Sequence, residues 1–236
     1  MIPDQLARPL AARVAGLAEA DTVRRPITTA FTDEGVLEAA EAALTAGKTH
    51  YTDRPGILPL RQQISAYLAQ FGLDVAPGAI TITCGVTEAR FVAFKQWLGN
   101  GKALYSSDSA LVAGVLHLLG AQTVESAISA SVIYARNVAD LAVSIPALPP
   151  DSSVWLIWEL TDTLTPDETK PIIDLLQSKN LLPHLLVIGE LPHLAGWRVG
   201  WMAGSSAAEK LRAFKQSISI CTPSISQWAA LGAAQT

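Results

Sequence analysis

The sequence is poor in cysteine, in charge and in long apolar runs. Its 236 residues include two cysteines, Cys84 and Cys221, with no metal-ligand spacing. This excludes a disulfide-rich scaffold and suits a reducing compartment. No uncharged apolar stretch approaches the roughly 18 residues that suggest a membrane span, and residues 1–5 do not begin a signal peptide. We therefore expect a cytoplasmic protein that does not bind a membrane.

Charge is scarce and slightly negative. Only 16% of the residues are charged and the formal net charge is -4, which argues against nucleic acid or an anionic membrane as a partner. Half of the residues are hydrophobic, which predicts a packed core rather than disorder. No repeat is visible. The length allows one large α/β domain or two small ones.

Helical segments and short apolar strands follow one another along the chain. Residues 33–46 predict a helix, with Thr32 or Asp33 as N-cap and Gly47 as its C-terminal stop. The β-branched run at 80–83 predicts a strand. Further strands are expected at 103–105, 121–124, 154–158 and 185–188, and further helices at 111–119 and 165–179. Residues 126–153 give no clear prediction.

The turn after the strand at 80–83 is a candidate anion site. Here Gly85, Val86 and Thr87 lead from the strand into an apolar helix. A strand, a glycine turn and a helix N-terminus together offer free backbone N–H groups and the positive end of the helix dipole to a phosphate. Taken alone the Gly-x-Thr pattern is a weak signal, because any turn between a strand and a helix can carry it.

Three ordered motifs resemble those of the class I/II aminotransferases, which are pyridoxal-phosphate (PLP) enzymes of fold type I. Residues 194–201, Leu-Ala-Gly-Trp-Arg-Val-Gly-Trp, resemble the segment after the family's cofactor lysine. Residues 51–61 are similar to its Tyr-Thr-x-x-x-Gly-x-x-x-Leu-Arg motif, and residues 80–89 to its phosphate-binding turn. The resemblance implies the large PLP-binding domain, an α/β fold with a mainly parallel sheet and helices on both faces.

The resemblance also implies domain limits and cofactor-binding residues. An N-terminal arm or helix is expected at 1–34 and the large domain at 35–236, with the family's small domain missing or vestigial. Gly85, Val86 and Thr87 would cradle the PLP phosphate and Arg198 would supply positive charge. Tyr51 would cross a dimer interface to the PLP phosphate of the partner. The alternative is that Tyr51 is a loop aromatic that covers the core and has no role toward PLP. No metal site is expected.

The catalytic lysine of the family does not stand at its expected place. Six positions before Gly196 the chain has Glu190, which cannot form an imine. Glu190 either occupies the lysine position or descends from the glutamate of the family's Asp-Glu pair, and the pyridinium-binding aspartate is absent under both alignments. One strand at 185–188 leads straight to Gly196, so we expect a deletion to have fused two family strands. Each of the seven lysines is expected to be solvated: Lys48, Lys95, Lys102, Lys170, Lys179, Lys210 and Lys215.

Three functions are considered, two from this resemblance and a third unrelated to PLP, and whether the chain is an enzyme stays open. The first is an aminotransferase-family protein of the amino acid/2-oxo acid class with impaired or lost catalysis and weak or lost PLP binding. It would form a homodimer, or a heterodimer with an intact paralogue. The second is a genuine transaminase with a surrogate lysine. The third is a non-catalytic binder of another phosphorylated small molecule. The first is preferred because the lysine and the aspartate are both absent.

Overall fold

The computed structural model describes residues 34–98, 102–160, 165–191, 194, 196–204 and 206–234. Within these residues one sheet of seven strands has the order β1-β7-β6-β5-β4-β2-β3. Strand β7 is antiparallel to both of its neighbours, and the other pairs are parallel. The mainly parallel sheet is therefore confirmed. Its strands are β1 Ile80–Cys84, β2 Ala103–Tyr105, β3 Gln122–Thr123, β4 Val132–Ala135, β5 Trp155–Glu159, β6 Leu185–Glu190 and β7 Val199–Ala203.

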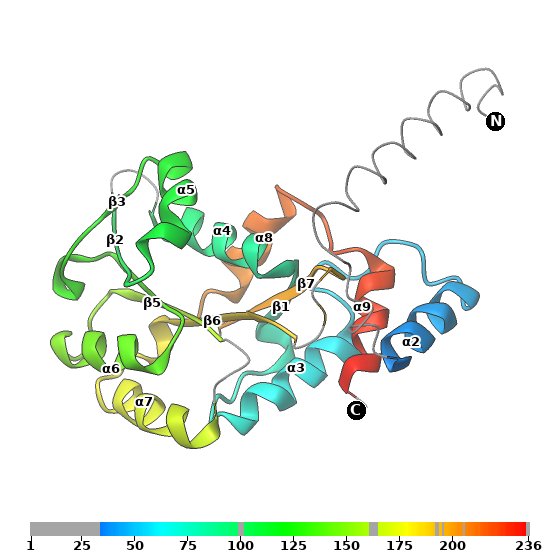
Figure 1. Cartoon of the computed structure of the whole chain (residues 1–236), viewed down its shortest axis with the longest axis horizontal. Helices are drawn as coiled ribbons and strands as arrows, with labels where there is room; N and C mark the ends of the chain where they lie inside the picture. Colours follow the sequence, from blue (N-terminus) through cyan, green and yellow to red (C-terminus); the bar gives the residue numbers. More distant parts are fainter. Residues whose placement is uncertain are drawn as a thin grey trace, which may run out of the picture. The chain divides into compact units, whose positions relative to one another are not determined.

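Helices cover both faces of the sheet, as predicted (Figure 1). One face carries α4, α5 and α8, the opposite face carries α3, α6 and α7, and α2 packs against α9 beside them. Their bounds are α2 Glu34–Thr45, α3 Leu58–Gln70, α4 Gly85–Leu98, α5 Ser109–Leu119, α6 Val138–Ala147, α7 Pro166–Ser178, α8 Ala208–Gln216 and α9 Ser224–Ala230. The short 3-10 helices are η2 Pro77–Ala79, η3 Ala127–Ser129, η4 Leu182–His184 and η5 Gly232–Ala234. The predicted arm at 1–34 lies outside the described residues except for its last residue, so that domain boundary stays a prediction.

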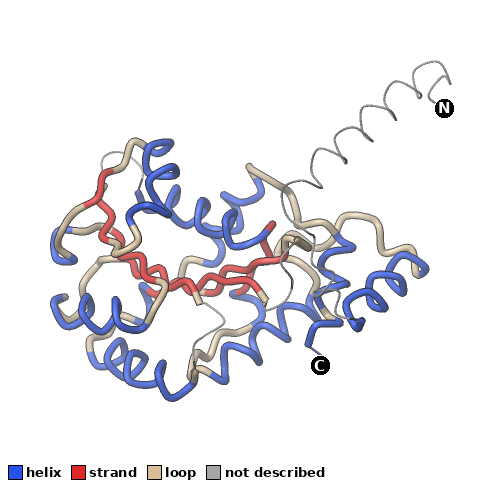
Figure 2. Tube along the Cα trace, viewed as in Figure 1, coloured by secondary structure: helices blue, strands red, loops and turns tan. Residues whose placement is uncertain are grey.

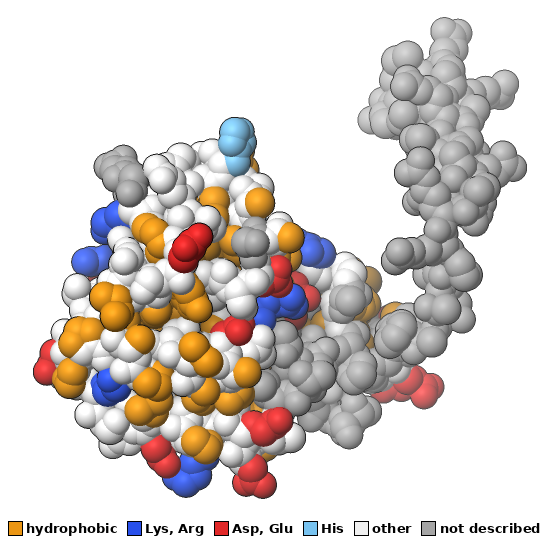
Figure 3. Space-filling model, turned by 60° about the vertical axis from the view of Figure 1, so that its left-hand side comes forward, with side chains coloured by type: hydrophobic (Ala, Val, Ile, Leu, Met, Phe, Trp, Pro, Cys, Tyr) orange, Lys and Arg blue, Asp and Glu red, His pale blue; other side chains and the backbone are white. Residues whose placement is uncertain are grey.

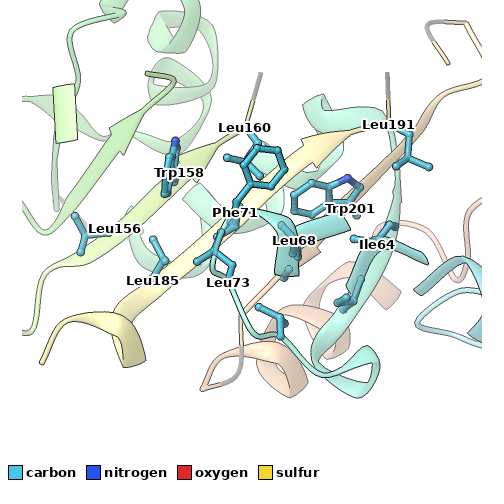
Figure 4. Packing of buried hydrophobic residues seen from close by; sticks show 14 of the residues in the cluster. Ile64, Leu68, Phe71, Leu73, Leu156, Trp158, Leu160, Leu185, Leu191 and Trp201 are labelled. Atoms are coloured by element: carbon cyan, nitrogen blue, oxygen red, sulfur yellow. The ribbon is translucent and has the colours of Figure 1, made fainter. Parts of the chain in front are cut away.

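Alternating strand residues build two separate cores, one on each side of the sheet. Trp158 and Trp201 point to the side of α3, where Phe71 and Leu68 also pack (Figure 4). The neighbouring strand residues point to the side of α4 and α8, as Met202 does. Each large side chain removed from water contributes about 1.5–3 kcal/mol relative to its exposed state. The central strands β4, β5, β6 and β7 are buried on both faces, which explains their almost continuous apolar sequence.

The expected stop of the first helix at Gly47 is confirmed, whereas its expected N-cap, Thr32 or Asp33, lies outside the described residues. Thr165 caps α7, and its side chain and that of Glu168 form a reciprocal capping box. Pro59 lies in the first turn of α3, where a missing N–H costs nothing. Gly47 and Gly120 end α2 and α5 with φ of +68° and +61°, a conformation that glycine adopts without strain.

One expectation about local structure needs correction, and one region without a prediction contains regular elements. The expected single strand from 185 to the Gly196 motif is wrong, because β6 ends at Glu190 and the chain returns as the antiparallel strand β7. Positive φ values at Gly196 and Arg198, +93° and +57°, accompany this reversal. Residues 126–153, for which nothing was predicted, contain η3, β4 and α6. The strand β4 is too short and too evenly apolar to show a period, and Pro146 stands inside α6.

Because β2, β3, β4, β5 and β6 are mutually parallel, their carboxyl ends lie at one end of the sheet. The strands continue into loops and helices at their ends (Figure 2). In open α/β sheets, ligands bind at this end of the strands. Polar and charged side chains follow directly there: Asp108 after β2, Arg136 after β4, Glu159 at the end of β5 and Glu190 at the end of β6.

The surface mixes apolar and charged side chains. On the face shown in Figure 3, hydrophobic patches lie between isolated side chains of both signs, without a continuous basic area. Exposed apolar residues include Leu118, Ile128 and Val143. In the described part of the chain, no helix combines the length and apolar character needed to cross a bilayer.

Gln227 in α9 ties three segments together and provides the first prediction. Its Oε1 accepts from Ile57 N at 2.9 Å, and its Nε2 donates to Thr222 O at 2.7 Å and to Thr52 Oγ1 at 3.0 Å. Replacing Gln227 by Met keeps the volume but leaves these groups without the amide. We expect a loss of about 2–4 kcal/mol in the free energy of unfolding, measured by urea denaturation. The matched control Gln177→Met, on the exposed face of α7, should stay within about 0.5 kcal/mol of wild type. Equal stability of the two variants would contradict the assignment.

Candidate functional site

The turn between β1 and α4 is built on glycines. Gly85 has φ of +75°, and a Cβ atom there would lie 2.8 Å from Glu190 Oε1 and 3.0 Å from Arg198 Cζ. Gly200 of β7 faces the same turn, and a Cβ on it would lie 2.4 Å from Gly85 C and 2.6 Å from Val86 N. Side chains at these two positions are therefore excluded, and the backbone of β7 packs directly on the first amides of α4.

A carboxylate of the chain itself binds this turn. Glu190 Oε1 accepts a hydrogen bond from Val86 N at 2.6 Å. Val86 lies in the first turn of α4, a helix of 14 residues, where the N–H groups have no partner within the helix. A charged acceptor at a helix N-terminus gains both a strong hydrogen bond and a favourable interaction with the helix dipole. The predicted phosphate-binding amide is thus engaged by Glu190.

Arg198 stands on the other side of Gly85. Its Nη2 donates to Cys84 O at 3.0 Å, and its backbone is left-handed, with φ of +57°. Such a conformation costs a non-glycine residue on the order of 1–3 kcal/mol and persists where the surroundings fix it. The guanidinium therefore lies beside the turn, and its role toward a phosphate stays a prediction.

Two other predicted residues take less central places. Thr87 is exposed in the first turn of α4. Tyr51 is 72% exposed, so the alternative that it covers the core is wrong. It lines an open depression of about 410 Å³ together with His50, Cys221 and Pro223, among others. The structure thus brings Gly85, Val86, Glu190 and Arg198 together and places Tyr51 in a depression that these four residues do not line.

The expectation that every lysine is solvated is wrong for Lys215. This residue of α8 is 1% exposed, because it lies one turn after the buried Leu211 on the face toward α4. Its Nζ donates to Ser219 Oγ at 3.1 Å and lies 3.7 Å from Glu88 Oε2. A buried ammonium needs this pairing, because desolvation without a counter-charge costs several kcal/mol. The amphipathic pattern of α8 does not predict that Glu88 of α4 pairs with Lys215.

Glu88 connects this lysine to the β1–α4 turn. Its Oε2 accepts from Cys84 N at 2.6 Å and its Oε1 from Ser219 Oγ at 2.7 Å. Burial, with a further contribution from the Glu88 charge, raises the pKa of the Cys84 thiol. Since the thiolate is the reactive form of cysteine, Cys84 is kept as a thiol and is not an activated nucleophile.

A second ionic cluster, which sequence reasoning missed, lies at the end of β5. Glu159 accepts a forked pair of bonds from Arg90, with Nε at 3.0 Å and Nη2 at 2.7 Å, and a third from Tyr134 Oη at 2.7 Å. Arg136 Nε lies 3.2 Å from Glu159 Oε1 as an ion pair without hydrogen-bond alignment. The four residues stand on α4, β4 and β5 and just after β4, far apart in sequence. No motif links them.

This cluster holds the Tyr134 hydroxyl in its neutral form. Burial and the neighbouring Glu159 carboxylate raise the pKa of Tyr134 well above its ordinary value, more than Arg90 lowers it. For Arg90, burial opposes the charged form, but the Glu159 carboxylate outweighs this and raises its pKa. The oxygens of Glu159 are used inside the protein, so this residue is a structural counter-ion rather than a free carboxylate.

The sheet order, with one antiparallel strand, and the two helical layers are those of the large domain of fold type I PLP-dependent transferases. The crystal structure of an aromatic aminotransferase from Pyrococcus horikoshii matches with a TM-score of 0.72 at 18% identity, covering 87% of this chain and 65% of that one. An aspartate aminotransferase from Thermus thermophilus, with maleate, matches with a TM-score of 0.67 at 20% identity over 85% of this chain and 61% of that one. The predicted fold class is confirmed.

Sequence comparison leads to the same family. A (5-formylfuran-3-yl)methyl phosphate transaminase of Methanocaldococcus jannaschii is 28% identical over 226 residues, which span 85% of this chain and 59% of that protein. An aspartate aminotransferase of Thermotoga maritima is 24% identical over an alignment of 242 positions, which covers 86% of this chain and 63% of that protein. No protein-family model matches the chain. In sequence and in fold the chain resembles the class I/II aminotransferases, and it spans about 60% of the length of these two relatives.

The raised pKa of Tyr134 gives a prediction for alkaline pH. Above the ordinary tyrosine value of 10.0, the unfolded chain releases this proton before the folded chain does. The contribution of Tyr134 to stability is therefore complete at neutral pH and is lost as the pH rises above about 10. The difference in phenolate absorbance between wild type and Tyr134→Phe isolates this group. We expect the difference to appear only with alkaline unfolding, followed by circular dichroism. A difference signal that titrates in the folded protein at the ordinary value would refute the buried assignment.

Proposed function

We propose that this chain is an aminotransferase-family protein of the amino acid/2-oxo acid class that does not catalyse transamination. The observation that carries the proposal is the Glu190 carboxylate on Val86 N at 2.6 Å, where the resemblance places the PLP phosphate. Transamination requires an amine that forms an imine with the cofactor and then moves the substrate proton. Glu190 cannot act as that amine.

The sheet bears on the two alignments of Glu190. Strands β5 and β6 are separate, with α7 between them, and β6 is the strand that leads to the Gly196 motif. This favours the alignment in which Glu190 occupies the lysine position. Because Glu190 binds the amide expected to hold the phosphate and supplies no amine, PLP binding is weak or lost in this proposal.

The alternative, a transaminase with a surrogate lysine, rests on Lys215. Five lysines are exposed and Lys179 is half-buried, with its Nζ donating to Pro146 O and Leu148 O. Lys215 is buried beside the β1–α4 turn, which favours it over the others as a surrogate. Its pairing with Glu88 opposes that role, because an imine forms only from the neutral amine.

Covalent trapping separates these two functions. The folded protein is titrated with PLP, reduced with borohydride and digested, and pyridoxyl-lysine is located by mass spectrometry. We expect no aldimine absorbance band and no residue labelled above the level of the urea-unfolded chain. Lys215→Met removes the buried amine. Lys210→Met, on the exposed face of the same helix, is the matched control. Specific labelling of one lysine in the folded state, abolished in Lys215→Met alone, would establish the surrogate instead.

We also propose that the chain pairs through the surface around Tyr51, either with a second copy or with an intact paralogue. Tyr51 is 72% exposed, and Ile220, next to Cys221 of the same depression, is 55% exposed. Exposed aromatic and aliphatic side chains at one depression are typical of protein interfaces.

The expected oligomer is a homodimer for the chain alone. Sedimentation equilibrium should give twice the monomer mass for wild type, and Tyr51→Ser should raise the dissociation constant at least tenfold. Leu118→Ser, at an exposed apolar residue of α5, is the matched control and should leave it unchanged. A monomeric wild-type chain would rule out the homodimer and leave the paralogue as partner.

A further inference from the structure

We propose that Glu190 is an internal anion that fills the phosphate place of the β1–α4 turn and excludes external phosphate from it. This inference rests on the proposed function, since it explains why the turn would not bind the phosphate of PLP. It goes further in naming one side chain whose removal opens the turn to an inorganic anion.

The geometry of three groups supports the inference. Glu190 Oε1 lies 2.6 Å from Val86 N. The same oxygen and Arg198 Cζ lie 2.8 and 3.0 Å from one point, the place where a Cβ on Gly85 would stand. The carboxylate and the guanidinium therefore both flank Gly85, and the carboxylate binds the helix-start amide as a bound anion would.

The position of the carboxylate is fixed by its strand. Glu190 pairs with Gly200 in the β6–β7 register, and Gly200 packs on the turn itself. The preceding residue, Gly189, packs on the Trp201 ring. The backbone that bears the carboxylate is thus part of the same rigid frame as the amide that it binds.

A phosphate ion cannot share this place. The phosphate oxygens would need the same Val86 N–H. The negative charge of phosphate would also be repelled by the Glu190 carboxylate, which is held at hydrogen-bond distance from that amide. Arg198 brings one positive charge to the turn, which does not balance two anions. Replacing Glu190 by Gln removes the competing charge, keeps the volume of the side chain, and leaves the turn and Arg198 in place.

The test compares inorganic phosphate binding by three chains. Isothermal titration and thermal unfolding are measured in phosphate and in chloride of equal ionic strength, for wild type, Glu190→Gln and Glu41→Gln. Glu41 lies on the exposed face of α2, so its variant matches the change in net charge. We expect Glu190→Gln to bind phosphate at least tenfold more tightly than the other two, with a saturable rise in melting temperature. The double variant Glu190→Gln/Arg198→Gln should lose this gain.

Equal phosphate affinity of Glu190→Gln and Glu41→Gln would overturn the inference, as would binding by wild type that is as tight as that of Glu190→Gln. A measurement on wild type alone guards against a variant that does not fold. The Val86 amide resonance should not shift when phosphate is added to wild type, and a saturable shift would contradict occupancy by Glu190. Failure here is distinct from failure of the proposed function, because lysine trapping by PLP and phosphate binding by Glu190→Gln are separate readouts.

Discussion

The contact between the first turn of α4 and the end of β6 is the constraint on which the rest of the site depends. Gly85 and Gly200 allow the backbones of the turn and of β7 to touch, and Glu190 supplies the side-chain oxygen that Val86 N binds. Because β7 runs antiparallel between β1 and β6, the same strand sets the distance between the turn and Glu190. The sheet topology therefore fixes the local chemistry.

Helix α4 is held by charge as well as by packing. Toward α8, Glu88 contacts Cys84 N, Ser219 and Lys215; toward the sheet, Arg90 is bound by Glu159 and Tyr134. Breaking a buried pair of this kind by removing one partner costs about 3–5 kcal/mol. Glu88 and Arg90 thus anchor α4 to different elements. This fixes the position of the Val86 amide relative to Glu190.

The sequence allowed many of the elements outside residues 126–153 and the fold class to be predicted, because signals such as Thr165 and Gly47 act locally and the motifs stand in family order. It did not allow the ionic clusters to be predicted. Arg90 and Glu159 are 69 positions apart, and nothing in their neighbourhoods marks them as partners. Lys215 lies on a helix with ordinary amphipathic spacing, where burial depends on an acidic residue of another helix. The reversal between β6 and β7 was missed because two apolar strands with few residues between them resemble one fused strand.

The frame of the β1–α4 turn can be separated from the residue that departs from the aminotransferase motifs. Gly85 and Gly200 belong to motifs that resemble the family, and the close approach of β7 to the turn requires both of them. Glu190 stands six positions before Gly196 and satisfies Val86 N. A lysine at the end of β6 would instead bring a second cation to a turn that already carries Arg198. Under the proposed function, one residue therefore accounts both for the missing amine and for the occupied amide.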